Sequence, residues 1–388
     1  MKRLWRLVLI MGCVWSMSAV AEGKTLEVGA EKPYRVPSQA IAATGDGDTI
    51  LIQAGVYRND WAQVRADNLT IRGVGGEAVL SSYGMIPNRK AIWVVKGDNV
   101  RIENVEFRGA RVRDRNGAGI RQEGRNLTLR RCSFFNNQNG ILGGSGDCVV
   151  DVQHCEFGHN SLVASPGTHN LYIGRCKQLI FKYNYSHHAK MCHLLKSRAR
   201  ENIIMYNRLS DEESGSSSYV MNLPNGGRAL IVGNILHQGP RCQNRTVVAY
   251  GEEGVREDGN ALWFINNTVI NDCERGRPTF VSINKLSEDF RPFLLNNVFV
   301  GKGQVTNCSK AVLRSNFTGR VPEAGFVDRE LWNLRLKEGS PCIDSGISLQ
   351  EVGKGVAPTP ARHYLHPMGS EERPDDGELD IGAYEYSE

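Results

Sequence analysis

The chain has 388 residues, with 47 Lys and Arg against 42 Asp and Glu, 40% hydrophobic residues and only 14 Pro. This composition is typical of an ordered protein and excludes a disordered or collagen-like chain. The length exceeds the usual ~100–200 residues of one domain, so the chain forms either two domains or one elongated repeat architecture.

Residues 1–21 are predicted to be a secretory signal peptide. Basic residues are followed by an apolar stretch over 7–14 and a small-residue cleavage site over 19–21. Removal of its three positive charges lowers the formal charge from +5 to +2, so the composition gives no support for nucleic-acid binding. No other stretch approaches the ~18 apolar residues of a membrane span. We therefore expect a secreted or periplasmic monomer that has no transmembrane segment in its mature form.

Nine of the ten Cys follow the signal peptide, in a setting that is expected to be oxidising. An odd number leaves at least one free thiol in a monomer. We expect the pairs Cys242–Cys273 and Cys308–Cys342, because each closes a local loop. The sequence contains no CxxC motif, which argues against a zinc ribbon or a thioredoxin-type site.

Residues 22–48 are expected to form an N-terminal segment with a capping helix. Over 37–43, a Pro-Ser start followed by Ala and Ile predicts a short helix that covers the open end of a hydrophobic core. The turn residues over 45–48 and the apolar run over 49–52 then predict the first strand.

Between residues 49 and 320 the sequence repeats itself. Short β-rich runs end near an Asn or its equivalent, at spacings of 27, 23, 30, 23, 27, 33, 30 and 19 residues. An irregular period in the twenties, built of strands and turns, predicts a solenoid whose stacked coils, ~4.8 Å apart, form parallel sheets around one core. The equivalent positions are Asn104, Arg131, His154, Asn184, Asn207, Asn234, Asn267, Asn297 and Asn316.

This repeat explains the 29 Asn residues of the chain, more than an ordinary share. A corner Asn can pair its amide with the coils above and below, and it tolerates the left-handed backbone of a tight corner. We therefore interpret the glycosylation-like motifs at Asn126 and Asn266 as ladder positions, with glycosylation as the alternative.

Residues 321–388 lack strand periodicity. The motifs Gly-Ser-Pro-Cys-Ile-Asp-Ser-Gly over 339–346 and Asp-Ile-Gly-Ala-Tyr-Glu over 380–385 bracket a Pro-rich stretch. We expect an irregular C-terminal cap that lies back on the solenoid, where it would cover sheet edges.

Three features carry a family resemblance: the opening Gly-Asp-Gly-Asp-Thr-Ile-Leu-Ile-Gln-Ala-Gly-Val-Tyr over 45–57, the Asn-ended coils and the two closing motifs. With them, the sequence resembles secreted bacterial right-handed parallel β-helix proteins of the pectate-lyase-like superfamily over roughly residues 35–386. The resemblance implies an all-β fold, a single right-handed parallel β-helix of about ten coils with a short N-terminal capping helix and an irregular C-terminal cap. Members of this superfamily include polysaccharide lyases, glycoside hydrolases, uronate epimerases and proteins without known activity. The resemblance is therefore only weak evidence for which reaction this protein catalyses.

Reactive side chains are densest over residues 168–228. Tyr172, Lys196 and Asn222 lie twelve, eleven and twelve residues before their corner Asn residues. Nearly equal offsets from the corner predict that these three residues lie on adjacent coils of one sheet, close to vertical register.

Alternation along a strand places Lys196 and Arg198 on the same face, and a buried Lys–Arg pair is rare, so both should face solvent in a groove. His193 lies at the strand start and can point either way. Each candidate has a structural alternative, because His and Tyr also stack in ladders and charged residues also cover ordinary outer strands. The candidate catalytic residues are Lys196, Arg198, His193, Tyr172, His169 and Tyr219, and the candidate substrate-binding residues are Asn222, Arg121, His187 and Asn225.

A groove that combines Lys, Arg, Tyr and His suits an acidic polysaccharide as the partner. β-Elimination requires a cation or amide that takes up charge on the uronate carboxylate, a base for the C5 proton and an acid for the leaving glycosidic oxygen. Arg198 and Asn222 suit the first task and Lys196 or a neutral His193 suits the second. Either Tyr of the groove suits the third.

Other activities have less support in the sequence. The groove strands contain no recurring pair of carboxylates for a glycosidase, and the chain has neither Asp-Pro-His-Asp nor GxSxG. No cofactor is predicted, although a sparse calcium site at Asp211, Glu212 and Glu213 stays open. We therefore expect a polysaccharide lyase. A non-catalytic glycan-binding or envelope-associated β-helix protein is the alternative, and a uronate epimerase or a glycoside hydrolase is a lesser one.

Overall fold

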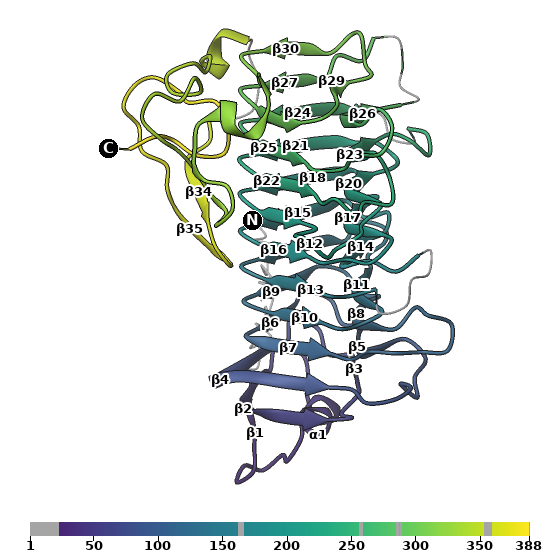
Figure 1. The fold of residues 1–388 in the computed structure, drawn as a ribbon. Helices are drawn as coiled ribbons and strands as arrows, with labels where there is room; N and C mark the ends of the chain where they lie inside the picture. Colours follow the sequence, from purple (N-terminus) through teal and green to yellow (C-terminus); the bar gives the residue numbers. More distant parts are fainter. Residues whose placement is uncertain are drawn as a thin grey trace, which may run out of the picture.

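The computed structural model describes residues 23–161, 167–255, 259–284, 287, 289–352 and 359–387. Within these ranges the chain winds into one right-handed parallel β-helix of about 10 turns (Figure 1), as the sequence predicts. The predicted signal peptide over 1–21 lies outside the described residues. Among the residues described, no helix is long and apolar enough to cross a membrane.

The coils contribute strands to three faces, and each strand pairs in parallel with its counterpart on the next coil. Face 1 comprises β6 (Val100–Glu103), β9 (Leu127–Arg130), β12 (Val149–Gln153), β15 (Gln178–Lys182), β18 (Glu201–Met205), β21 (Arg228–Val232), β24 (Ala261–Ile265), β27 (Phe293–Leu295) and β30 (Val312–Arg314). Face 2 comprises β7 (Val105–Arg108), β10 (Ser133–Phe135), β13 (Glu156–Gly158), β16 (Tyr185–His187), β19 (Arg208–Ser210), β22 (Ile235–Gln238), β25 (Thr268–Asn271), β28 (Val298–Gly301) and β31 (Phe317–Gly319). Face 3 comprises β3 (Ala62–Val64), β5 (Ala91–Val95), β8 (Ala118–Gln122), β11 (Asn139–Gly143), β14 (Leu171–Ile173), β17 (His193–Ser197), β20 (Tyr219–Leu223), β23 (Thr246–Tyr250), β26 (Thr279–Ile283) and β29 (Gln304–Thr306).

The N-terminal end of the solenoid is closed by a short helix. The chain enters through β1 (Thr25–Val28) and α1 (Pro37–Ala42), and then forms β2 (Thr49–Arg58) and β4 (Thr70–Ser81). Both of these strands are long, and β4 pairs with β6 of face 1 and with β7 of face 2. Pro37, Ala40 and Ile41 of α1 are buried, so the predicted capping helix is confirmed.

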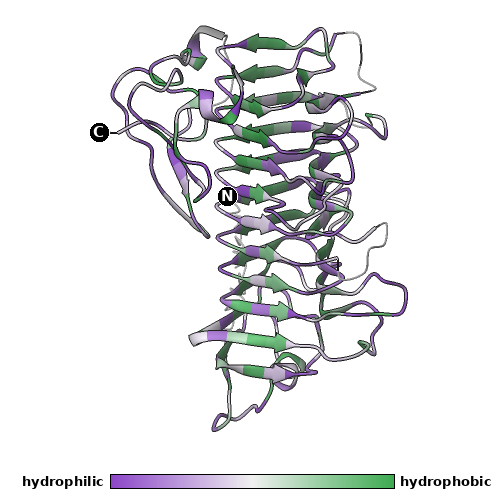
Figure 2. Cartoon of the chain, viewed as in Figure 1, coloured by the Kyte–Doolittle hydropathy of each residue, from purple (hydrophilic) through white to green (hydrophobic). Residues whose placement is uncertain are grey.

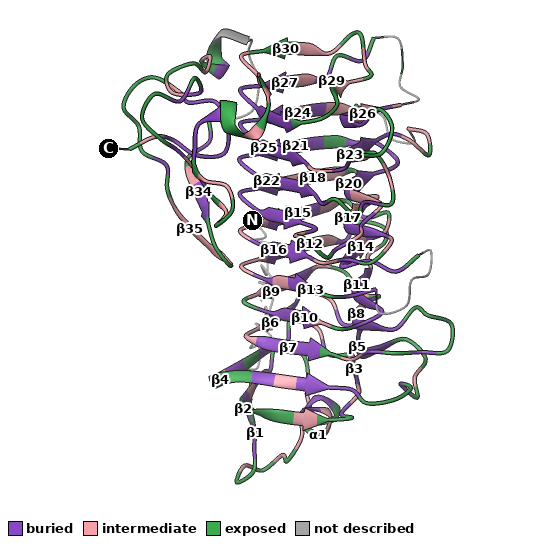
Figure 3. Cartoon of the chain, in the orientation of Figure 1, coloured by how far each residue is buried: buried purple, intermediate pink, exposed green. Residues whose placement is uncertain are grey.

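Side chains that alternate inward from the three faces fill the core, and the strands are mostly hydrophobic and buried (Figures 2 and 3). Phe107, Phe134 and Phe157 stack on successive coils with ring centroids 5.2 and 4.8 Å apart. Gly119 and Gly140 on face 3 lie opposite this column, where an added Cβ would come within 2.8 and 3.0 Å of the rings of Phe134 and Phe157. The aromatic column therefore requires glycine at these two positions.

A ladder of Asn side chains runs along the corner between faces 1 and 2. The backbone N–H of Asn184 donates to Oδ1 of Asn207 at 2.9 Å, and that of Asn207 donates to Oδ1 of Asn234 at 3.0 Å. The same type of hydrogen bond links Asn234 to Asn267, Asn267 to Asn297 and Asn297 to Asn316, toward the C-terminal end of the solenoid. The predicted structural role of the Asn excess is confirmed, because each of these side chains satisfies backbone groups on neighbouring coils.

The structure corrects the predicted alignment by one residue in the lower coils. Asn104, Arg131 and His154 have φ angles of 52°, 51° and 55°, so they bend the corner in the left-handed conformation. In the upper coils that conformation belongs to the residue before the ladder Asn, such as Tyr206 with φ of 55°. The sequence predicts one corner position per coil, but the structure has two consecutive ones. The first residue adopts the left-handed conformation that bends the corner, and the second is the ladder position.

The two glycosylation-like motifs have different structural roles. Asn126 belongs to a second ladder, in which its Nδ2 donates to Asn99 at 2.8 Å and Asn99 donates to Asn68 at 2.9 Å. Asn266 has a φ of 50° and donates to the backbone oxygen of Asp380 at 2.7 Å. The ladder prediction is therefore confirmed for Asn126, whereas Asn266 bends a corner and holds the C-terminal segment.

The C-terminal segment lies back along the side of the solenoid, as predicted (Figure 1). It shares an apolar core with face 2, in which Ile235, Ile270 and Val298 belong to the same buried cluster as Tyr364 and Ile381. Its regular elements are two antiparallel strand pairs and two 3-10 turns. These are η1 (Val321–Ala324), β32 (Phe326–Asp328), β33 (Asn333–Leu336), η2 (Leu349–Val352), β34 (Arg362–Leu365) and β35 (Gly369–Glu372).

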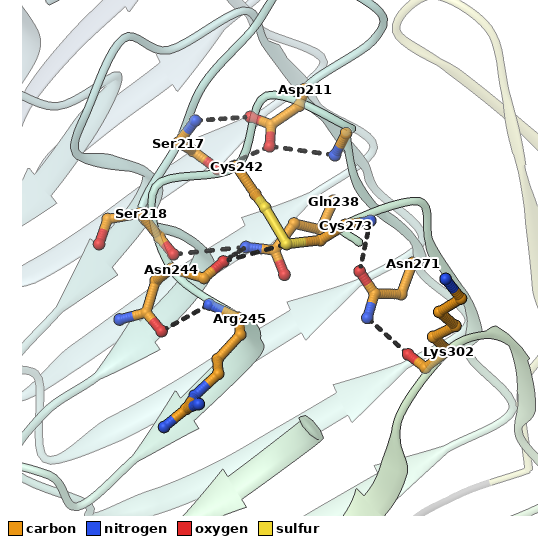
Figure 4. The surroundings of a disulfide bond; sticks show 11 residues. Asp211, Ser217, Ser218, Gln238, Cys242, Asn244, Arg245, Asn271, Cys273 and Lys302 are labelled. Carbon is orange, nitrogen blue, oxygen red and sulfur yellow. Dashed lines mark hydrogen bonds between the residues drawn. A yellow bond between two sulfur atoms is a disulfide. The ribbon is translucent and has the colours of Figure 1, made fainter. Parts of the chain in front are cut away.

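One of the two predicted disulfides is present. Cys242 and Cys273 are bonded across neighbouring coils, beside the backbone oxygen of Asn244 (Figure 4). Cys308 and Cys342 are free thiols. The predicted Cys308–Cys342 pair is wrong because Cys308 packs against the main core, whereas Cys342 is buried in the core of the C-terminal segment.

Candidate functional site

A group of reactive side chains lies on face 3, where three successive strands bring distant residues together. Tyr172 of β14 pairs with Lys196 of β17, and Lys196 pairs with Asn222 of β20. The vertical register that the sequence predicts for these three residues is confirmed. Since neighbouring parallel strands lie ~4.8 Å apart, the three side chains form one outward column.

Lys196 and Arg198 both point outward, since the alternate residues Leu195 and Ser197 are buried. The side chains of Lys196 and Arg198 are 12% and 18% exposed. Nε of Arg198 donates to the hydroxyl of Tyr172 at 2.8 Å, and Nζ of Lys196 lies 5.5 Å from the centre of the Tyr172 ring. The two cations and the phenol therefore form a compact unit at the surface.

Asn225 fixes the orientation of the guanidinium. It lies in the turn after β20, where its Oδ1 accepts a hydrogen bond from Nη1 of Arg198 at 2.6 Å. Its own Nδ2 donates to the backbone oxygen of Gly254 at 3.1 Å. Arg198 is thus held from the coil below by Tyr172 through Nε and from the coil above by Asn225 through Nη1.

A carboxylate from two coils above lies against both cations. Oε2 of Glu253 is 2.7 Å from Nη2 of Arg198, and Oε1 is 3.3 Å from Nζ of Lys196. Burial raises the pKa of Glu253, but the hydrogen bond from Arg198 and the charge of Lys196 outweigh that effect and lower the pKa below its ordinary value. Glu253 is therefore ionised at neutral pH, and the cation pair accepts a carboxylate in this geometry.

Two buried imidazoles lie beside the cations. The rings of His169 and His193 stack with centroids 4.7 Å apart, and their Nδ1 atoms are 2.9 Å apart. Burial, followed by the charges of Lys196 and Arg198, lowers the pKa of His169 to about 3. Burial, His169 and the same two cations lower the pKa of His193 well below its ordinary value. Both rings are therefore neutral at pH 7, and one Nδ1 donates to the other.

The upper side of the site contains an aromatic ring, an amide and a second carboxylate. The ring of Tyr219 stacks on His193 with centroids 5.2 Å apart, and Nδ2 of Asn222 donates to Oε1 of Glu252 at 2.8 Å. Burial, and then the hydrogen bond and charge of Glu252, raise the pKa of Tyr219. Oδ1 of Asn222 is buried without a partner in the described part of the chain. Asn222 and Glu252 offer two of the oxygen ligands that Ca²⁺ prefers.

Neither carboxylate of the site is among the residues predicted from the sequence. Glu252 and Glu253 lie in the loop after β23, and Ala249 of that strand pairs with Asn222. Extending the register count by one more coil would have located them, because they follow the aligned Ala249 by three and four residues.

Two predicted site residues lie outside this group. Arg121 belongs to the same column, but Leu142 separates it from Tyr172, so it is two coils below. Burial lowers the pKa of Arg121. His187 is on face 2, where Nε2 lies 3.1 Å from Oε1 of Glu156. The predicted placement of His187 in the groove is therefore wrong, because β16 faces away from β14 and β17.

The acidic run suggested as a sparse calcium site also lies apart from face 3. Asp211 is buried and accepts hydrogen bonds from Ser217 and Gly239. Oε1 of Glu212 pairs with Arg208 at 2.5 Å. Both oxygens of Asp211 and Oε1 of Glu212 are thus already bonded within the protein.

Comparison with known proteins agrees with this architecture. A family model described as the right handed beta helix region matches residues 54–269. The structure is similar to pectate lyase Pel9A, at 15% identity and a TM-score of 0.65, over 95% of this chain and 98% of that one. It is also similar to an alginate lyase from Paenibacillus sp. str. FPU-7, at 15% identity and a TM-score of 0.49, over 76% of this chain and 98% of that one.

No curated protein matches the sequence. The similarity to the pectate lyase shows the fold alone, since the identity is 15%. The family match covers more than half of the chain, from the first coils past the residues described above. By this match, and by the ten coils of its solenoid, the chain belongs to the right-handed β-helix family.

Proposed function

We propose that this protein is an exported enzyme that cleaves a uronate-containing polysaccharide by β-elimination on face 3. The observation that carries the proposal is the position of Glu253, a carboxylate held jointly by Lys196 and Arg198. A uronate presents the same group, so a substrate carboxylate can replace Glu253 on the two cations. The disulfide between Cys242 and Cys273 fits export to an oxidising compartment.

The reaction needs three groups that act on different atoms. A base removes the C5 proton, the electron pair forms the C4–C5 double bond, the C4–O bond breaks, and the leaving oxygen takes up a proton. Arg198, oriented by Asn225, binds the carboxylate and stabilises the charge that builds on it. Asn222 lies one coil above Lys196 and adds an amide donor.

The base and the acid come from neighbouring coils. We assign the base to Lys196, whose side chain points outward from face 3 and whose amine must release its own proton before it takes the one on C5. His193 is a weaker candidate, since its pKa is lowered well below the ordinary value and its ring is buried. Tyr172 is the acid: its oxygen accepts from Arg198, which leaves its own proton available for the leaving oxygen.

The alternative function is glycan binding without cleavage. The same groove suits it, because the interactions that hold a carboxylate do not depend on catalysis. The pectate lyase shares the fold, which supports only the ability of such a solenoid to carry elimination chemistry.

The test is to incubate the chain without its predicted signal peptide with a panel of uronate polysaccharides and to follow the ultraviolet absorbance of the 4,5-unsaturated product. The proposal predicts unsaturated ends on at least one polymer of the panel. New reducing ends without unsaturation would instead show hydrolysis, inverted uronates would show epimerisation, and binding with no chemical change would show a binding protein. Each of these three outcomes overturns the elimination proposal.

A further inference from the structure

A second group of functional side chains lies on face 2, outside the groove. His187 ends β16, and it pairs with Gly158, the last residue of β13 on the coil below. His159 and His188 are the residues that follow these two strands, with φ angles of 53° and 51°. The fold therefore places three His on adjacent coils at one corner.

The three rings face one another closely. His159 and His188 stack with ring centroids 4.4 Å apart, and His187 is edge-on to both, at 5.4 and 4.8 Å. One nitrogen from each ring lies within 4.8 Å of the other two. Nδ1 of His187 is 2.5 Å from Nδ1 of His188. Three imidazole nitrogens thus converge on one point.

His187 is held in a fixed orientation by its surroundings. Its Nε2 lies 3.1 Å from Oε1 of Glu156, so Nε2–H donates to the carboxylate and Nδ1 keeps its lone pair. The ring of Tyr185 stacks on it with centroids 4.2 Å apart. An added Cβ on Gly158 would lie 2.4 Å from Cε1 of His187, so glycine provides the space for the ring.

We propose that His159, His187 and His188 form a site for a divalent transition-metal ion of the zinc class. Three neutral imidazoles suit Zn²⁺, Co²⁺, Ni²⁺ or Cu²⁺ and are poor ligands for Ca²⁺ or Mg²⁺. A carboxylate that accepts the second N–H of a ligating His is the usual support of such sites, and Glu156 provides it. Zn–N distances of about 2.0–2.1 Å place the nitrogens of a tetrahedral site roughly 3.3 Å apart. The present separations lie on both sides of this value, from 2.5 Å between the Nδ1 atoms of His187 and His188 up to the 4.8 Å limit of the cluster, so ring rotations can bring the three nitrogens to it.

Neighbouring charges do not prevent this assignment. Lys190 and Arg208 contribute positive charge near His159 and His188. Arg208 is already paired with Glu212, and Glu156 adds a further negative charge beside His187. The cations are therefore balanced by carboxylates of the same corner.

The experiment uses the chain without its predicted signal peptide, after dialysis against a chelator. Titration calorimetry with Zn²⁺ is expected to show one site per chain, and Co²⁺ is expected to give the visible absorption of nitrogen ligation without a thiolate charge-transfer band. His159→Asn and His188→Asn should abolish this binding. Glu156→Gln should weaken it by about 10–100-fold, the usual effect of losing a carboxylate that supports a ligating His.

His154→Asn is the matched control. His154 also occupies a left-handed corner, with φ of 55°, but it bonds to the backbone oxygen of Met368 and lies outside the cluster. Asn tolerates that conformation at all three positions, and His159 is exposed, so His159→Asn keeps the fold even where His188→Asn does not. The proposal is overturned if the wild-type chain binds no Zn²⁺, if both His variants bind as the control does, or if Co²⁺ shows thiolate ligation.

The outcome is independent of the proposed lyase function. Lys196→Ala lies on face 3 and should leave Zn²⁺ binding unchanged, whereas His159→Asn should leave binding of polysaccharide unchanged. A failure of one proposal therefore leaves the other intact.

Discussion

At the scale of single residues, the groove is a carboxylate-binding site already occupied by a carboxylate of the chain. Glu253 offsets part of the positive charge of Lys196 and Arg198, so it reduces the repulsion between these cations in the absence of substrate. Under the proposed function, a substrate uronate displaces Glu253, and the binding energy of its carboxylate is then the difference between two similar interactions. Specificity then depends on what surrounds the carboxylate, above all Tyr172 and Asn225.

Removing the amine of Lys196 should reduce the rate strongly. Loss of a general base typically costs 10²–10⁴-fold, so Lys196→Ala is expected to lower kcat by about that factor while the fold stays intact. Initial rates on the active polymer measure the effect. Arg200→Ala is the control, because Arg200 is a cation of the same coil that pairs with Asp147 at 2.6 Å, outside the groove. Equal loss in both variants would mean that Lys196 has no special role.

Removing the charge of Glu253 should strengthen substrate binding. Glu253→Gln takes away the internal competitor, and two partly exposed ion pairs of up to ~1 kcal/mol each correspond to a gain on the order of tenfold in affinity. The dissociation constant of an acidic oligosaccharide, measured by calorimetry at low salt, tests this. Glu123→Gln removes a comparable surface pair, with Lys90 at 2.5 Å, and should have no effect. Weaker binding by Glu253→Gln would identify Glu253 as a substrate ligand instead.

The sequence predicts much of this site because, in a repeat, the number of residues between a side chain and its corner Asn predicts where that side chain lies on its coil. Tyr172, Lys196 and Asn222 have similar offsets from the corner, so register alone brings them together. His187 was misplaced because closeness in sequence to His193 says nothing about which face a residue occupies. Glu252 and Glu253 were missed because they lie in a loop, where strand alternation gives no information.

At the scale of elements, the Asn ladder joins coils that otherwise share only strand hydrogen bonds. Asn207 accepts from the backbone of Asn184 and donates to the backbone oxygen of Phe181 at 2.8 Å. It also donates to Oδ1 of Asn234 at 2.9 Å. One buried side chain therefore connects three coils, and no apolar residue can replace it without leaving backbone groups unsatisfied.

Truncating a central rung of the ladder should destabilise the whole solenoid. Asn207→Ala leaves the backbone N–H of Asn184 and the carbonyl of Phe181 without their partner, and each such loss costs about 1–3 kcal/mol. Urea unfolding is expected to show a decrease in stability of at least about 2 kcal/mol. Asn316→Ala, at the half-buried last rung, serves as the graded comparison and should cost less. A larger loss at Asn316 would show that the upper end of the solenoid, not the ladder, limits stability.

The fold was predictable at this scale for a physical reason. A coil that cannot bury its own apolar face must repeat, and the repeat is visible in the sequence as short β-rich runs that end near an Asn. The one-residue error in the lower coils arose because the left-handed corner and the ladder are adjacent positions and both favour Asn. Where Cys155 replaces the ladder Asn and His154 bends the corner, composition no longer distinguishes them.

At the scale of the whole molecule, the solenoid separates its reactive groups by face. The groove residues lie on face 3, the three-His cluster lies on face 2, and the C-terminal segment packs along face 2 and its corner with face 1. A rigid stack of coils keeps the two groups apart, so each can be altered without moving the other. The buried imidazoles of the groove nevertheless affect the stability of the entire chain, because they must stay neutral while it is folded.

Acid should therefore destabilise the molecule before most carboxylates titrate. The pKa of His169 is about 3 in the folded state against an ordinary value of 6.5. Between these values the unfolded chain binds more protons, so the stabilisation is complete above pH 6.5 and is lost as the pH falls toward 3. For this one group, the loss between pH 7.5 and pH 5 is about 2 kcal/mol. Urea unfolding at the two pH values measures this loss of unfolding free energy, and His169→Gln should reduce the loss by that amount.

If the loss in His169→Gln equals that of the wild type, His169 is not the group responsible. His154→Asn controls for the removal of a His outside the groove.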